Sequence, residues 1–144
     1  MDALKLLKQD HAKVKKAFRK FEKMDHESHA AQELATQTIA ELKLHTTLEE
    51  EIVYPALREA IDDDALMNEA VVEHKSASQL ILDLESMQPS DPMFAASFTV
   101  LGEHVDRHVK EEEAEMFKKA RKAKVDLAAL GQQIAARKAG QRAS

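Results

Sequence analysis

The feature that most constrains this chain is a hydrophobic repeat of about 3.6 residues, which runs through four long segments. Such a repeat places apolar side chains along one face of an α-helix, whereas the period-two alternation of a half-buried strand is almost absent. The repeat predicts helices over about residues 2–24, 30–60 and 92–122, and a further helix between Asp62–Asp64 and the loop at 88–92.

These helices predict an all-α fold, an up-down-up-down four-helix bundle with a short C-terminal helix. We expect residues 1–124 to form the bundle, and residues 125–144 to form the short helix and a basic tail. Asp126 is the expected N-cap of that last helix, which should run over about residues 127–138. Pro55, near the end of the second helix, is expected to kink or end it.

Charge and composition exclude several classes of partner and site. The chain has no cysteine, so thiolate metal sites and iron–sulfur clusters are excluded. Residues 118–144 carry a net charge of +7 and residues 1–117 one of −12. We expect the basic tail to lie on the acidic body, and its lack of aromatic residues argues against nucleic-acid binding. No uncharged run is long enough to span a membrane, and the charged N-terminus has no secretory stretch, so we expect a cytoplasmic protein. We also expect the bundle to be a monomer.

Polar side chains interrupt the apolar face of every predicted bundle helix. Each of the four helices has one histidine on that face, and two of them add a glutamate one turn later. These residues are His11, His45, Glu49, His74, His108 and Glu112. A single core histidine is common, but burying two unpaired carboxylates with four imidazoles would cost several kcal/mol for each carboxylate. A shared metal centre removes this cost because the polar groups become ligands, so the pattern predicts a metal site.

Helix geometry also selects between neighbouring glutamates. Glu49 and Glu112 lie about 40° around the helix from the histidine four residues earlier, whereas Glu50 and Glu113 lie about 140° away and are expected to be solvated. Four imidazoles and two carboxylates exceed a tetrahedral zinc site, and magnesium or calcium would need mostly oxygen ligands. The donor set suits two iron ions bridged by the carboxylates, with manganese as an alternative metal.

The ordered motifs resemble the signature of the hemerythrin-like, HHE cation-binding family. They are His11, His45-Thr-Thr-Leu-Glu49, Glu73-His74 and His108-Val-Lys-Glu-Glu112. The resemblance covers about residues 8–122. It implies a non-haem centre of two iron ions (Fe²⁺/Fe³⁺) with an oxo or hydroxo bridge, which binds or reacts with dioxygen, peroxide or nitric oxide.

The chain departs from the oxygen-carrying hemerythrins at two positions. Those proteins have a further histidine one turn after the position of His74, where this chain has Ser78, whose side chain is expected to point into the metal pocket. Their last carboxylate lies five residues after its histidine. In this chain the helical repeat instead favours Glu112, four residues after His108, as the ligand. Two octahedral ions offer about twelve positions, and the predicted ligands with an oxo bridge would leave about two of them open.

Two further residues are candidate ligands for an open position. His104 lies one turn before His108, toward the edge of the apolar face. If it is not a ligand, we expect it to contact a ligand residue or to lie at the edge of the bundle. Tyr54 lies opposite His45 on an ideal helix, so it would be a packed surface tyrosine unless a kink at Pro55 turned it inward. The remaining histidines, His26 and His29, are expected to be solvated.

Three functions are compatible with such a centre. An oxygen or redox sensor or store would bind a small molecule, whereas a catalase-like, peroxidase-like or oxidase enzyme would consume it. The open positions favour an enzyme, but no second buried acid–base pair is evident to move protons. In a third alternative the metal has only a structural role.

Overall fold

The computed structural model describes residues 1–143, so Ser144 of the predicted tail lies outside the described residues. The helices confirm the predicted all-α fold, with two π-helical turns, η1 and η2, set between α-helices. In chain order the elements are α1 (Ala3–Glu22), α2 (His29–Leu48), η1 (Glu49–Val53), α3 (Tyr54–Ile61), α4 (Asp64–Glu85), α5 (Pro92–Glu111), η2 (Glu112–Met116), α6 (Phe117–Lys122) and α7 (Leu127–Ala143).

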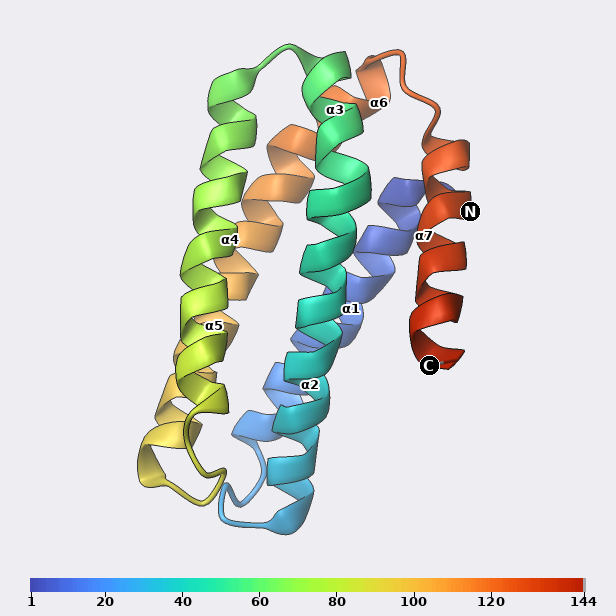
Figure 1. Ribbon diagram of the computed structural model, residues 1–144. Coiled ribbons are helices and arrows are strands. Elements are labelled where there is room, and N and C mark those ends of the chain that lie inside the picture. The colour runs from blue at the N-terminus through green and yellow to red at the C-terminus, as the bar shows by residue number, and fades with distance from the viewer. Residues whose placement is uncertain (144) are drawn as a thin grey trace.

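Four long rods form the bundle in Figure 1: α1, the continuous segment from α2 to α3, α4, and the continuous segment from α5 to α6. They are joined at alternate ends, which is the predicted up-down-up-down order. The last helix, α7, lies beside α1 near the N-terminus, and it runs to Ala143 rather than ending near residue 138. Alanine, glutamine and arginine dominate its last turns and all favour helix, so helical structure extends further than expected.

Polar caps set the start of the bundle helices. The side chains of Asp2, Ser28, Asp63 and Asp91 each accept a hydrogen bond from a backbone N–H in the first turn of the following helix. Asp126 does the same for α7, as predicted. These bonds satisfy N–H groups that have no partner inside the helix.

The π-helical turn η1 changes which residues of the second rod face the core. An ideal α-helix through Leu42 and His45 would place Ile52 and Ala56 on its apolar face, but they are only partly buried, whereas Val53, Tyr54 and Leu57 are buried. A π turn holds one residue more than an α turn, so the side chains that follow are rotated by about 100° around the axis. An ideal helix therefore predicts the wrong buried face for the residues after Glu49.

Pro55 does not end the second rod. It lies in the first turn of α3, directly after η1, and the helical backbone continues to Ile61. Proline is tolerated in the first turn of a helix because its missing N–H has no intrahelical partner there.

The core consists of two apolar clusters with a layer of polar side chains between them. One cluster lies at the end of the bundle that α7 covers and includes Leu7, Leu48, Ala70 and Met116. The other lies at the opposite end. The polar layer interrupts all four rods and comprises His11, His45, Glu49, His74, His108 and Glu112.

The last helix contributes to the first cluster through Leu130 and Ile134. Two of its basic side chains lie on the acidic body, as expected: Lys138 Nζ lies 2.5 Å from Asp10 Oδ1, and an Arg137 guanidinium nitrogen lies 2.8 Å from a Glu51 carboxylate oxygen. The predicted division of the chain near residue 124 stays a prediction.

Two glycines of α7 allow its packing to be tested. A Cβ added at Gly131 would lie 2.3 Å from the Met1 carbonyl oxygen and 3.1 Å from the Ala3 backbone nitrogen. We expect Gly131→Ala to lower the free energy of unfolding by about 1–3 kcal/mol, because the backbone must shift. No heavy atom lies within 4 Å of the same position at Gly140, so Gly140→Ala should raise it by about 0.5–1 kcal/mol. Denaturant unfolding measures both, and equal effects would contradict close packing at Gly131.

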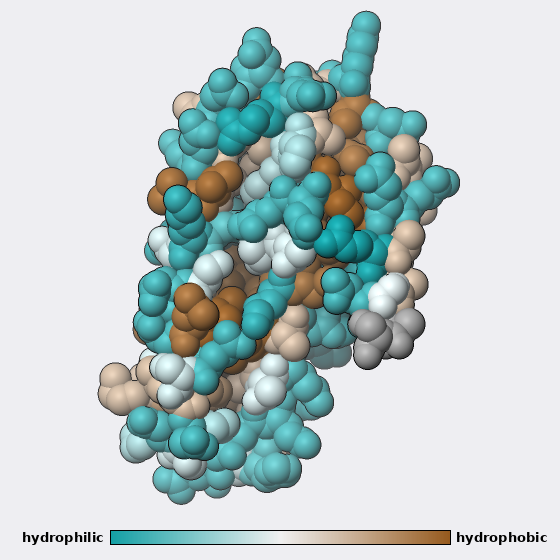
Figure 2. Space-filling view, in the orientation of Figure 1, coloured by the Kyte–Doolittle hydropathy of each residue, from teal (hydrophilic) through white to brown (hydrophobic). Residues whose placement is uncertain are grey.

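The surface is mostly hydrophilic. On the face shown in Figure 2, hydrophilic side chains predominate and small hydrophobic patches lie over α4. The exposed apolar side chains of α4 include Val72 and Leu82. Within residues 1–143, no helix has the length and apolar character needed to cross a bilayer.

Candidate metal centre

The four rods bring all six predicted ligands into two overlapping groups. Ligand atoms of His11, His45, Glu49 and Glu112 lie within 4.8 Å of one another. The same holds for a second group, in which His74 and His108 replace the first two histidines. Both glutamates belong to both groups, so the two candidate metal-binding groups share two carboxylates.

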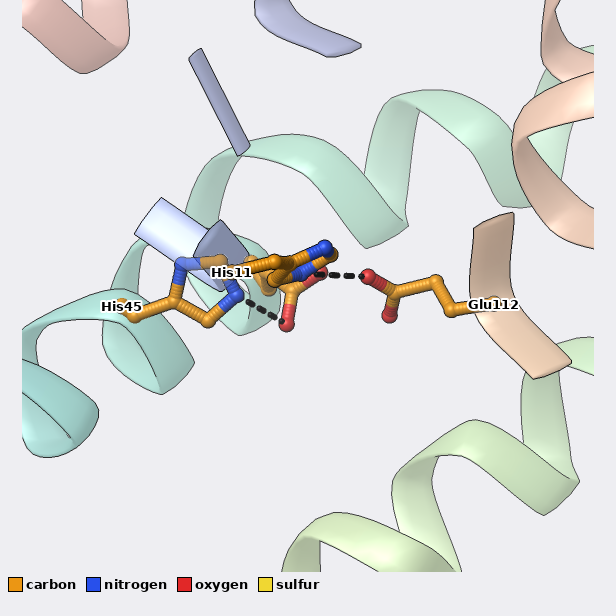
Figure 3. Close-up of side chains that lie close together, drawn as sticks. His11, His45 and Glu112 are labelled. Carbon is orange, nitrogen blue, oxygen red and sulfur yellow. Dashed lines mark ion pairs between the residues drawn. The ribbon is translucent and has the colours of Figure 1, made fainter. Parts of the chain in front are cut away.

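In each group the histidine Nε2 atoms point at the shared carboxylates. Figure 3 shows His11 and His45 converging in this way, with the Glu112 carboxylate facing His11 at 3.3 Å between Nε2 and Oε1. The Nε2 atoms of His45 and His74 lie 3.1 and 3.2 Å from Glu49 Oε1. His108 Nε2 lies 3.2 Å from Glu112 Oε2.

These short contacts fit metal ligands better than hydrogen bonds. Although the atoms are close, Nε2 of His11 and His108, both Glu49 oxygens and Glu112 Oε1 are buried without any hydrogen-bond partner. Two donors about 2.1 Å from one ion and at right angles to each other lie about 3 Å apart. The observed spacing of 3.1–3.3 Å matches that of atoms directed at a common ion. The chemistry of the donors fits two cations in this layer.

The histidines are held in this orientation by carboxylates at Nδ1. Glu113 lies 2.7 Å from His11 Nδ1, and Glu50 lies 3.2 Å from His74 Nδ1. Both glutamates are predicted to be solvated. The Glu50 side chain is exposed (47%), whereas Glu113 is half-buried (32%), and both accept a hydrogen bond from a candidate ligand histidine. Such outer partners fix the ring and leave Nε2 free for a metal.

Of the other two histidines, His45 has an equivalent hydrogen bond, whereas His108 has a carboxylate nearby but no hydrogen bond at Nδ1. His45 Nδ1 donates to Asp10 Oδ2 at 2.9 Å, and His108 Nδ1 lies 3.3 Å from a Glu73 oxygen. In the sequence, Asp10 directly precedes His11 and Glu73 directly precedes His74. Every imidazole of the layer thus has a carboxylate beside its Nδ1.

The contacts of the two groups are related by an approximate two-fold repetition. Exchanging α1 with α4, and the rod from α2 to α3 with the rod from α5 to α6, converts one set of contacts into the other. Tyr54 and Phe117 occupy equivalent places, since each is the first residue after a π turn. Tyr54 stacks on His74 with ring centroids 5.1 Å apart, and Phe117 stacks on His11 at 5.8 Å. The Tyr54 hydroxyl is the main chemical difference between the two groups.

Tyr54 is buried in the centre rather than packed at the surface. Its hydroxyl donates to Glu112 Oε2 and lies 3.2 Å from His74 Nε2, and only 4% of the residue is exposed. The π turn, rather than a kink at Pro55, turns it inward. The sequence carried one signal for this, because the spacing from Glu49 to Tyr54 equals that from Glu112 to Phe117.

His104 and Ser78 lie outside both groups. His104 Nε2 donates to the Glu73 carbonyl oxygen at 3.1 Å, and its Nδ1 accepts from Arg107 at 3.2 Å. Ser78 was expected to face the metal pocket, but its side chain is exposed, and the preceding Ala77 lines the inner cavity instead. The apolar face of α4 is broad, and packing against the neighbouring rods turns the edge that carries Ala77 inward, away from the edge that carries Ser78.

The two remaining histidines differ from each other. His26, expected to be solvated, is partly buried, and its ring stacks on Phe21 with centroids 4.4 Å apart. The His29 side chain is 86% exposed, as predicted.

Comparison with known proteins agrees with this geometry. The family described as the hemerythrin HHE cation binding domain matches residues 2–120. The chain belongs to this family. Its structure is similar to the crystal structure of a hemerythrin HHE cation binding domain-containing protein from Mycobacterium kansasii, with a TM-score of 0.81 and 26% sequence identity, over 95% of this chain and 85% of that one. No curated protein matches the chain.

The HHE domain concentrates buried negative charge at this layer, which attracts cations. Burial alone would lower the pKa of His45, but Glu49 and Asp10 raise it to about 10. Burial is likewise outweighed at His108, where Glu112 raises the pKa to about 9. Burial opposes the charge of Glu49, yet His45 and His74 hold its pKa well below the usual range. Protons thus occupy the metal-free layer, and metal ions binding there would displace them.

The HHE domain also encloses a small apolar cavity next to the centre. Its volume is about 30 Å³. The apolar side chains that line it belong to all four rods: Val14, Leu42, Ala77, Ile81, Leu101, Val105 and Val109. The rest of the lining includes five histidines and three carboxylates. Since a water molecule needs at least about 10–15 Å³ of such space, the cavity admits a molecule of two or three heavy atoms and excludes bulky substrates.

Proposed function

We propose that this HHE domain holds two iron ions, one in each four-residue group, and uses them to bind and react with dioxygen, peroxide or nitric oxide. The observation that supports this most is the sharing of Glu49 and Glu112 between two groups in which several buried ligand atoms lack hydrogen-bond partners. Two bridging carboxylates with imidazoles on each side suit iron, and manganese is the alternative. That the protein is a cytoplasmic monomer stays a prediction.

The apolar cavity supports small, weakly polar reactants. Its surface is mostly apolar and its volume is small, so it favours neutral diatomic molecules or peroxide over charged organic substrates. When bound, the iron ions would supply the electrons that such oxidants exchange. The carboxylates at each Nδ1 would hold the imidazoles in place while charge changes at the centre.

Tyr54 favours consumption of peroxide over reversible carriage of dioxygen. Burial, followed by the charges of Glu49 and Glu112, raises the pKa of Tyr54 well above its usual value, so the metal-free pocket keeps the phenol protonated. A metal ion beside it would displace that proton and leave a phenolate. This hard anionic donor stabilises Fe³⁺ relative to Fe²⁺, whereas a reversible carrier must return to Fe²⁺.

Metal loading followed by peroxide assay tests the proposal. We expect two iron ions per chain, and peroxide should decay faster with loaded protein than with metal-free protein. His74→Ala should reduce the occupancy of one position, because His74 is the candidate ligand supplied by α4. The neighbouring Lys75→Ala, at an exposed position, serves as the control. Full loading without any reactivity would instead support a purely structural metal.

A further inference from the structure

A second cavity leads from the surface to the metal centre on the side away from the apolar cavity. It has a volume of about 200 Å³ and lies between α4 and the junction of α5 with η2. His108 and the buried Glu112 line it. Its remaining polar lining consists of glutamates from both rods, namely Glu69, Glu73, Glu111 and Glu115.

This cavity carries uncompensated negative charge. No lysine or arginine lines it. Glu69, Glu111 and Glu115 are exposed, and none of them forms an ion pair within 4 Å among the side chains described up to residue 141, although the charge of Glu115 acts on Lys119. Many other surface acids of this chain have a basic partner, as Asp63 has in Lys119 at 2.5 Å. Three carboxylates around one opening, two of them without a basic partner, produce a local field that attracts cations.

The acidic lining is continuous from the surface to a candidate ligand. An open depression of about 410 Å³ at the surface shares Glu69, Glu73 and Glu111 with the cavity. The cavity reaches Glu112, whose side chain is only 1% exposed, and His108, whose Nε2 has no hydrogen-bond partner. A cation that entered here would meet carboxylate oxygens until it reached an unsatisfied ligand atom.

The other approaches to the centre suit a cation less well. The surface depression next to Tyr54 is lined by Arg58 and Lys75 together with Glu50, so it carries positive charge at its rim. The cavity of about 30 Å³ also reaches candidate ligands, but it is much smaller than the glutamate-lined cavity of about 200 Å³, so a hydrated divalent ion fits it less well.

We propose that the glutamate-lined cavity is the route by which divalent cations enter the metal centre, with Glu69, Glu111 and Glu115 as a transient cation site at its mouth. The inference rests on the proposed function, since it requires that the centre takes up metal. It separates the path of the metal ions from that of neutral reactants, which would use the apolar cavity.

The rate of metal uptake tests this route. Metal-free protein is mixed rapidly with Co²⁺, and the absorption of bound Co²⁺ gives the rate and the number of ions bound. The variant is Glu69→Gln, Glu111→Gln and Glu115→Gln combined. Glu73 is left unchanged because it contacts His108. The control combines Glu27→Gln, Glu33→Gln and Glu59→Gln, which remove the same charge from exposed positions outside the cavity.

At low ionic strength we expect the cavity variant to take up Co²⁺ about tenfold more slowly than wild type, with two ions still bound at equilibrium. The control should load at nearly the wild-type rate, and the difference should shrink at 1 M salt, where the screening length is about 3 Å. Equal rates for the two variants, whether both unchanged or both slowed, would overturn the route. Failure of the wild type to bind Co²⁺ or Fe²⁺ would instead overturn the proposed function.

Discussion

Glu49→Gln should leave the protein able to hold at most one metal ion tightly. Glu49 is fully buried, and its Oε1 lies 3.1 Å from His45 Nε2 and 3.2 Å from His74 Nε2, so a single oxygen faces both groups. Glutamine keeps the shape but removes the negative charge, and its amide nitrogen does not bind a cation. We expect the affinity of at least one position to fall by more than about 100-fold, since even outer partners of ligands contribute about 10–100-fold.

Anaerobic titration with Fe²⁺ measures the number of ions and both affinities. Glu112→Gln should behave like Glu49→Gln because the approximate two-fold repetition makes the residues equivalent. The matched controls are Glu50→Gln and Glu113→Gln, which remove an Nδ1 partner but no candidate ligand. These variants should still bind two ions, with affinities lower by about tenfold. Loss of one ion in Glu113→Gln but not in Glu112→Gln would show that the carboxylate at the five-residue spacing is the ligand.

Tyr54→Phe should remove the visible charge-transfer band of the oxidised, iron-loaded protein. A phenolate bound to Fe³⁺ gives such a band, whereas water does not, and the Tyr54 hydroxyl is within 3.2 Å of His74 Nε2 in the second group. Phenylalanine fits the same space, because Phe117 occupies the equivalent position in the first group. We expect complete loss of the band, unchanged binding of two ions, and slower consumption of peroxide.

The reciprocal variant Phe117→Tyr provides the control for this prediction. It places a second hydroxyl beside His11, so the band should become stronger if position alone determines phenolate binding. A double variant, Tyr54→Phe with Phe117→Tyr, would then move the phenol from one group to the other and restore a band. Persistence of the band in Tyr54→Phe would exclude this tyrosine as its source.

The sequence by itself determined the helices, their caps and the polar layer. Each of these depends on contacts within one helix or on a repeat that a single helix displays. Asp91 before Pro92 predicts a helix start from local hydrogen bonding alone, and His11 stands out because it interrupts an otherwise apolar face. The six candidate ligands could therefore be selected without knowing how the helices pack.

Only the tertiary structure decided how these helices turn toward one another. An ideal α-helix turns by 100° per residue, but a π turn holds one extra residue. The side chains after it are therefore rotated around the axis, which brings Tyr54 into the centre. Neighbouring rods also decide which edge of a broad apolar face turns inward, so Ala77 lines the cavity and Ser78 does not. The carboxylate at each Nδ1 comes from a different rod. Contacts of this kind have no local signature, because they exist only once the four rods have packed together.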